Sequence, residues 1–121
     1  MLFFDPHRAA LPLYTKLRDS ITAAIPGVRI EVKKTQISFF TKLLFAAASF
    51  TPVIRVRERP TPFLTVSFIL PYRIPSGRVD AAAEPYSGRW THHVTIGSPE
   101  EVDAELMAWI QEAAAFAAAR Y

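Results

Sequence analysis

The stretch Arg89–Ile96 restricts the fold of this chain more than any other part of the sequence. Large or apolar side chains alternate in it with threonine or histidine. Because successive side chains point to opposite faces of a strand, the pattern predicts a β-strand with one face in a core. The core-side set is Trp90, His92, Val94 and Ile96, and the other set is Thr91, His93 and Thr95.

A helix start follows this strand directly. Gly97 lets the chain turn. Ser98 then suits the N-cap, Pro99 suits the first helical position, and Glu101 completes a capping box. Apolar residues recur at helical spacing beyond this point. The sequence therefore predicts a helix over residues 99–120.

The preceding part of the chain predicts one helix and several strands. Pro12 suits a first helical turn, and apolar residues keep helical spacing as far as Ile25. Pro26-Gly27 ends this N-terminal helix. Alternating or short apolar segments between turn signals predict strands. These are Val28–Lys33, Gln36–Phe40, Leu43–Phe50, Val53–Arg57 and Phe63–Leu70.

Two segments carry further expectations. Leu43–Phe50 is apolar on both faces, which favours a central strand covered on both sides, although a buried helix also fits the run. Residues 72–88 are punctuated by proline and glycine and are expected to form a long loop. Within that loop, residues 78–84 are expected to form a helical turn.

The predicted fold class is α+β, in a single domain over residues 1–121. Strands joined by short turns favour an antiparallel meander, here of five to six strands. The N-terminal and C-terminal helices must bury their apolar stripes, so both are expected to pack on one face of the sheet. A chain of 121 residues buries about two-thirds of its unfolded surface, enough for a self-sufficient core.

Composition excludes several kinds of chemistry. The chain has no cysteine, which excludes disulfides, thiolate nucleophiles, zinc fingers and iron–sulfur clusters. Leu2-Phe3-Phe4 is too short for the core of a signal peptide, and Leu43–Phe50 is far shorter than the roughly 20 residues of a membrane helix. A cytoplasmic protein without a membrane segment is expected. The net charge of +3 does not by itself indicate nucleic acid binding.

The histidine pair gives little support for a metal site. His92 and His93 point to opposite faces of their strand and therefore cannot easily bind one ion together. No His-x-His or His-x-x-x-His motif, catalytic serine motif or glycine-rich phosphate loop occurs. The sequence favours a protein without catalysis, metal ion or cofactor. It leaves open whether Trp90 and His92 line a pocket or close the edge of the core.

Polar and basic residues that interrupt or flank the apolar segments form the candidate binding site. Arginine forks beside lysine and histidine favour an anionic group such as a phosphate or carboxylate. The predicted function is a small binding or interaction domain for an anionic small molecule. The candidate residues are Lys33, Lys34, Gln36, Arg73, Arg89, Trp90, His92 and His93.

Other interpretations fit the same residues. An enzyme would use His92 or His93 as a general base and Arg73 or Arg89 as a substrate anchor. Single-stranded nucleic acid would stack on aromatic residues beside basic side chains. Aromatic residues on a surface patch or an exposed edge would favour a homodimer. The plainest interpretation is that these charges only solvate the wet face of the sheet.

Three motifs resemble those of a known family. They are Lys33-Lys34-Thr35-Gln36-Ile37-Ser38-Phe39, Leu70-Pro71-Tyr72-Arg73 and Arg89-Trp90-Thr91-His92-His93. Together with the helix start at Ser98 and with Trp109-Ile110, they resemble a family of small bacterial domains of unknown function, sometimes labelled predicted transport proteins. The resemblance covers residues 13–116, and at the level of fold it extends to YdhG-like α+β domains. It implies the fold and no particular activity.

Overall fold

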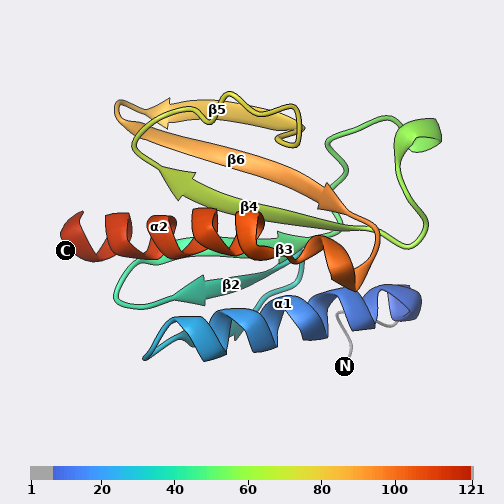
Figure 1. The fold of residues 1–121 in the computed structure, drawn as a ribbon, viewed down its shortest axis with the longest axis horizontal. Helices are drawn as coiled ribbons and strands as arrows, with labels where there is room; N and C mark the ends of the chain where they lie inside the picture. Colours follow the sequence, from blue (N-terminus) through green and yellow to red (C-terminus); the bar gives the residue numbers. More distant parts are fainter. Residues whose placement is uncertain (1–6, 121) are drawn as a thin grey trace.

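The computed structural model describes residues 7–120, with Val56 described by its backbone alone. Leu2-Phe3-Phe4 lies outside the described residues. Within this range two α-helices and six strands form an α+β fold, as the sequence predicts (Figure 1). The helices are α1 (Leu11–Ala24) and α2 (Ala104–Arg120), and the strands are β1 (Arg29–Val32), β2 (Gln36–Phe40), β3 (Leu44–Ser49), β4 (Leu64–Leu70), β5 (Ala81–Tyr86) and β6 (Arg89–Ile96).

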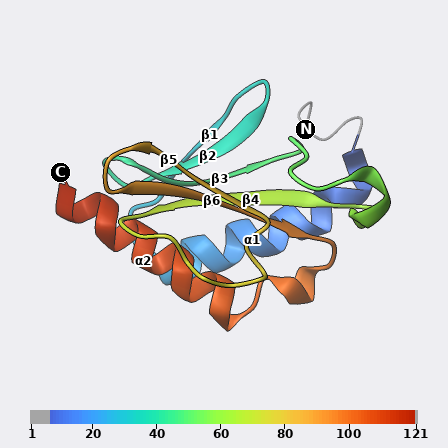
Figure 2. The same ribbon diagram turned by 90° about the horizontal axis from the view of Figure 1, so that it is seen from above.

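All six strands belong to one antiparallel sheet with the order β1-β2-β3-β4-β6-β5. Both helices lie on the same face of this sheet, which confirms the predicted packing (Figure 2). The two edges of the sheet, β1 with β2 on one side and β5 on the other, rise away from the helices. The face opposite the helices is therefore concave.

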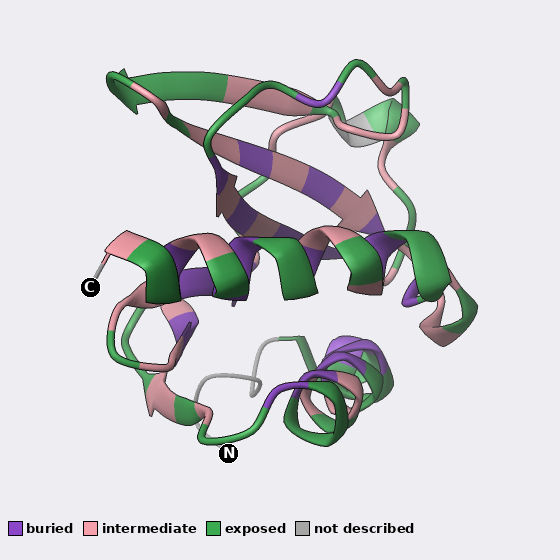
Figure 3. Ribbon diagram, turned by 60° about the vertical axis from the view of Figure 1, so that its left-hand side comes forward, coloured by how far each residue is buried: buried purple, intermediate pink, exposed green. Residues whose placement is uncertain are grey.

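The core lies between the sheet and the helices. Every second side chain of β4, from Leu64 to Leu70, is fully buried. These residues pair with the alternate set of β6 that runs from Trp90 to Ile96. Bands of buried and intermediate residues follow one another along β6 in Figure 3. The predicted faces of both strands are confirmed, and the helices cover the apolar one.

β3 is a central strand, as predicted, but the helices cover only one of its faces. A register shift between Phe39 and Phe40 of β2 adds one residue on the β3 side. Phe45 thereby turns into the core and is fully buried. The other face carries Ala47 and Ser49, each only 9% exposed, because longer neighbours shield small side chains at the bottom of a concave face.

The predicted strand Val53–Arg57 is wrong. β3 and β4 pair directly with each other, so the segment between them has no strand to pair with. It forms a loop with a short 3-10 turn at Val56–Glu58. Alternation in sequence is therefore insufficient where the ladder positions on both sides are already occupied.

The helical turn predicted over residues 78–84 is also wrong. Part of that segment belongs to β5, which pairs with β6 at the edge of the sheet. Ser87-Gly88 joins the two strands, with Gly88 at φ 73°, a conformation that favours glycine. The ladder to β6 supplies the backbone hydrogen bonds, and this outweighs the helix propensity of the alanines in β5.

The predicted helix from Pro99 is interrupted. A 3-10 turn covers Pro99–Glu101, and the Ser98 side chain makes no capping hydrogen bond. α2 begins only at Ala104. Its cap is Asp103, whose Oδ1 accepts a hydrogen bond from the Leu106 N–H at 3.0 Å. Asp103 therefore takes the capping role that the sequence pattern assigned to Ser98.

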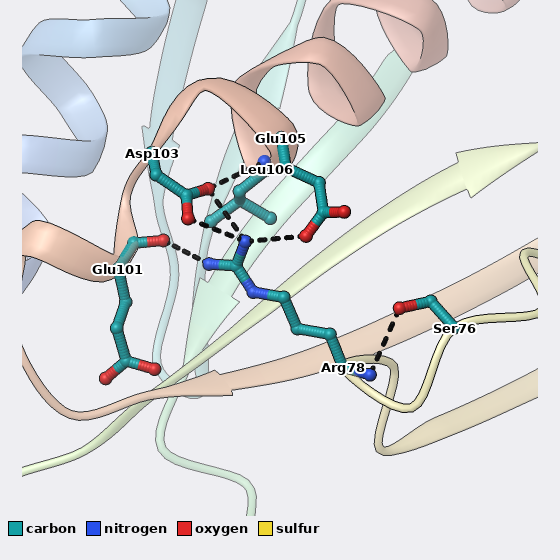
Figure 4. A network of polar contacts seen from close by, with 6 residues as sticks. All are labelled: Ser76, Arg78, Glu101, Asp103, Glu105 and Leu106. Carbon is teal, nitrogen blue, oxygen red and sulfur yellow. Dashed lines mark hydrogen bonds and ion pairs between the residues drawn. The ribbon is translucent and has the colours of Figure 1, made fainter.

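Asp103 also binds an arginine of the loop that connects β4 to β5. The Arg78 guanidinium donates to both oxygens of Asp103, at 2.7 and 2.9 Å, and to Glu105 at 3.0 Å. It donates as well to the carbonyl of Glu101 (Figure 4). The side chain of Arg78 is only 22% exposed. A single arginine thus joins the loop to the start of α2.

Arg78→Met tests this anchor, because it keeps much of the aliphatic length and removes the guanidinium. The carboxylates of Asp103 and Glu105 lose their shared cation, so the free energy of unfolding should fall by about 1–3 kcal/mol. Arg18→Met is the matched control, since Arg18 is 42% exposed and pairs with the adjacent Asp19. It should cost at most about 1 kcal/mol. Urea unfolding measures both, and equal losses would contradict the anchoring role.

Candidate functional site

His92 belongs to the core and closes its edge. Its side chain is fully buried and stacks on Phe68, with ring centroids 5.2 Å apart. Its Nε2 accepts a hydrogen bond from the Ile74 N–H at 3.0 Å, so the neutral ring carries its proton on Nδ1. Burial lowers the pKa of His92, and the main-chain groups of Phe68 and Trp90 offset only part of that effect. His92 is therefore a neutral structural residue.

His93 is the histidine of the concave face. Strand alternation places it there, directly across the β4–β6 ladder from Ser67. The Ser67 hydroxyl and His93 Nδ1 form a hydrogen bond of 2.7 Å. Burial lowers the pKa of His93, so the imidazole is neutral at neutral pH. A neutral imidazole beside a hydroxyl can accept a hydrogen bond or a proton.

Two adjoining hollows lie along the concave face and the end of the sheet. The inner hollow has a volume of about 180 Å³ and contains the Ser67–His93 pair. The outer hollow has a volume of about 380 Å³ and lies at the end of the sheet where β3 and β6 begin. Leu44, Ile69 and Thr91 line both. The two hollows therefore form one continuous depression, which we call the sheet groove.

The sheet groove changes character along its length. Its inner end offers an amide, a hydroxyl and an imidazole. Its middle is aliphatic, and its outer end carries a tyrosine and two guanidinium groups. From the inner to the outer end, these residues are Gln36, Ser67, His93, Leu44, Ile69, Tyr86, Arg89 and Arg120.

Arg89 and Arg120 reach the outer hollow from different elements, the start of β6 and the last turn of α2. Burial, followed by the nearby charge of Arg89, lowers the pKa of Arg120. The Arg120 guanidinium lies over the ring of Phe116, with Cζ 4.6 Å from the centroid. Among residues 7–120, buried Arg120 Nε has no hydrogen-bond partner, and no carboxylate forms an ion pair with either arginine. Two neighbouring cations without a counter-charge favour the binding of an anion.

Three of the residues predicted from the sequence lie in the sheet groove. They are Gln36, Arg89 and His93. Gln36 is oriented by a hydrogen bond of 2.8 Å from its Nε2 to the Ser38 hydroxyl. Alternation along β2 and β6 places these side chains on the same face, which is why the sequence pattern could find them.

The other predicted residues do not join them. Two lie on the opposite, helix-covered face of the sheet, two are exposed at the tip of the β1–β2 hairpin, and one is exposed in the β4–β5 loop. In that order they are Trp90, His92, Lys33, Lys34 and Arg73.

The candidate binding residues named from the sequence leave out several residues of the sheet groove. Ser67 and Thr91 share the concave face by alternation, so the pattern contained a signal for them. Arg120 gave no such signal, because a basic residue in the last turn of a helix is ordinarily explained by the helix dipole. Only the packing of α2 across the sheet brings Arg120 to the groove.

The described residues give no support for a metal centre. Among residues 7–120, no group of three or more His, Asp or Glu side chains lies close enough together to hold a metal ion. Within the same range, no helix is long and apolar enough to cross a membrane.

The two histidines give the stability of the fold a defined pH dependence. Their folded-state pKa values lie below the ordinary value of 6.5, so unfolding takes up protons between those values and 6.5. The contribution of the two neutral histidines to the free energy of unfolding is therefore full above about pH 6.5. It decreases as the pH falls toward the folded-state pKa values, by up to about 1.4 kcal/mol per pH unit for each histidine. His92→Gln and His93→Gln should each reduce this slope in denaturant unfolding.

The two variants should differ in stability at pH values above the range in which the histidines titrate. His92→Gln loses the stack on Phe68 and should also be less stable at about pH 8, whereas His93→Gln should change stability there by less than about 1 kcal/mol. An unchanged slope below pH 6.5 in both variants would contradict the burial of neutral histidines.

Comparison with known proteins identifies the family and nothing beyond it. No curated protein and no solved structure matches the chain. A family model, described as a domain of unknown function (DUF5655), matches residues 2–117. The prediction of a family of uncharacterised domains is thereby confirmed, and the chain belongs to the DUF5655 family.

Proposed function

We propose that this protein binds a small molecule with an anionic end and an apolar body in the sheet groove. The observation that carries the proposal is the pair Arg89 and Arg120. Both line the outer hollow, and neither has an ion-pair partner among residues 7–120. A bound carboxylate or phosphate would supply the counter-charge and accept charge-assisted hydrogen bonds from both guanidinium groups.

The rest of the groove supports an elongated ligand. Leu44 and Ile69 line the floor between the two hollows, so the middle of the ligand should be apolar. The Ser67–His93 pair and Gln36 lie beyond it. A neutral hydrogen-bonding group on the ligand would be favoured there, because His93 carries no charge at neutral pH. Ligand sites commonly combine an apolar lining with a few polar groups in this way.

Aliphatic carboxylates test the anionic anchor. Octanoate should bind more tightly than octanol, and its affinity should weaken as salt is added, because the anchor is electrostatic. Arg89→Gln and Arg120→Gln should each weaken octanoate binding about tenfold or more, since a charge-assisted hydrogen bond contributes about 1.5–3 kcal/mol. Isothermal titration calorimetry at low salt measures these affinities.

Arg73→Gln is the matched control for this experiment. Arg73 is an exposed arginine outside the sheet groove, in a separate hollow formed by the β4–β5 loop. Its replacement removes one positive charge and should leave octanoate binding within about twofold. If the three variants weaken binding equally, or if no carboxylate of any chain length binds, the groove is not an anion site.

The Ser67–His93 hydrogen bond supports one second candidate, acyl transfer. A neutral imidazole 2.7 Å from a hydroxyl can take the proton of that hydroxyl as it attacks an ester carbonyl. Among residues 7–120, however, no carboxylate is hydrogen-bonded to His93, so the orienting third group of a triad is missing. Binding without chemistry is therefore the better-supported function.

Hydrolysis of p-nitrophenyl butyrate separates the two candidates. If Ser67 is catalytic, Ser67→Ala should abolish ester hydrolysis. Ser38→Ala is the control and should leave hydrolysis intact, because Ser38 is a buried serine of the same face that is hydrogen-bonded to Gln36. On the binding proposal neither variant changes the hydrolysis rate. A selective loss in Ser67→Ala would establish catalysis and replace the simpler proposal.

A further inference from the structure

The two edges of the sheet differ in how they are protected. The β5 edge contains Pro85, which has no N–H to offer, and its pairing with β6 is irregular between Ala83 and Tyr86. Proline and irregular pairing are common devices that prevent a strand from adding to an edge. β1 has no proline, and its pairing with β2 is regular. The β1 edge is therefore the one open to another strand.

The backbone hydrogen bonds of β1 show which peptide groups face outward. The Lys33 N–H donates to the Gln36 carbonyl at 2.8 Å. Hydrogen-bonded and non-hydrogen-bonded pairs alternate along an antiparallel ladder. Arg29 and Glu31 therefore bond to β2, and the peptide groups of Ile30 and Val32 point away from it. Among residues 7–120, no strand pairs with these outward groups.

The side chains of β1 are self-complementary in the register centred on Ile30. An antiparallel second copy centred on Ile30 pairs the outward peptide groups of Ile30 with those of its counterpart. It also places Arg29 opposite Glu31 of the other copy, twice, at close non-hydrogen-bonded positions. A shift by two residues would put Glu31 opposite itself and Arg29 opposite Lys33, or Arg29 opposite itself. Like charges directly opposite each other are destabilising.

We propose that the chain forms a homodimer through β1, in the antiparallel register centred on Ile30, so that two sheets join into one. The same register covers apolar surface on the helix side. Val32, which is 51% exposed, then lies opposite Val28 of the other copy. Figure 2 shows the β1–β2 hairpin rising clear of both helices, so neither helix obstructs the edge.

The mass of the chain in solution gives the first test. Sedimentation velocity from micromolar to millimolar concentration should show the mass rising from 13.6 kDa toward twice that value. A wild-type chain that remains monomeric over the whole range would overturn the proposal.

Charge exchange tests the register. Arg29→Glu places glutamate opposite Glu31, and Glu31→Arg places arginine opposite Arg29, so each variant alone should be monomeric. An equimolar mixture of the two should dimerise again, because every facing pair is then of opposite charge. The double variant R29E/E31R should also dimerise. Thermal unfolding of each variant as a monomer checks that loss of the Arg29–Glu31 ion pair within the strand has not unfolded β1.

A disulfide tests the geometry directly, since the chain has no cysteine of its own. Arg29→Cys and Glu31→Cys face each other only in the proposed register, at a spacing that suits a cross-strand disulfide. Mixed and mildly oxidised, the two variants should give a covalent heterodimer in high yield, and each alone should give little. Dimers that persist in both charge variants, or that cross-link equally well in either cysteine variant alone, would place the interface elsewhere.

Discussion

The ladder between β4 and β6 is the interaction on which the rest of the structure depends. It pairs the two strands residue by residue from Leu64 with Ile96 to Leu70 with Trp90. Because side chains alternate, this one register places a largely apolar set under the helices and a largely polar set on the concave face. A slip of one residue would carry Ser67 into the core and Phe68 onto the concave face, so the packing of the core and the composition of the groove are set together.

The helix-covered face needs more than two helices to close it, and the β4–β5 loop completes the cover. Ile74 is buried, and its N–H donates a hydrogen bond to His92 Nε2. The Tyr72 hydroxyl donates to Glu112 of α2 at 2.5 Å, and Arg78 ties the loop to the start of the same helix. A long irregular segment is thus held by a few polar bonds at its two ends. Its role in the described structure is to seal the core edge, which leaves the concave face as the open surface.

The same physical rule explains why the two faces carry different chemistry. Burial penalises charge, so His92 and His93 are neutral at neutral pH, and each has one ring nitrogen hydrogen-bonded to a neutral partner. Arginine cannot lose its proton at such a pH. Arg89 and Arg120 therefore remain charged beside each other at the rim of the groove, where no carboxylate among residues 7–120 forms an ion pair with them. The two ends of the groove therefore differ in charge, with neutral polar groups at the inner end and two cations at the outer end.

Local pattern determined most of the fold. The alternation of β4 and β6, the amphipathic N-terminal helix and the split of His92 from His93 all follow from side-chain geometry within one segment. The faces of Gln36, Ser67 and His93 are determined in the same way. Tertiary structure decided the remainder. Residues 53–57 do not form a strand because β3 and β4 pair directly with each other and leave no strand edge between them. β5 forms a strand because β6 has an edge with which it can pair. Arg120 meets Arg89 only because α2 packs across the sheet, and such a meeting of distant segments depends on long-range packing that no local periodicity encodes.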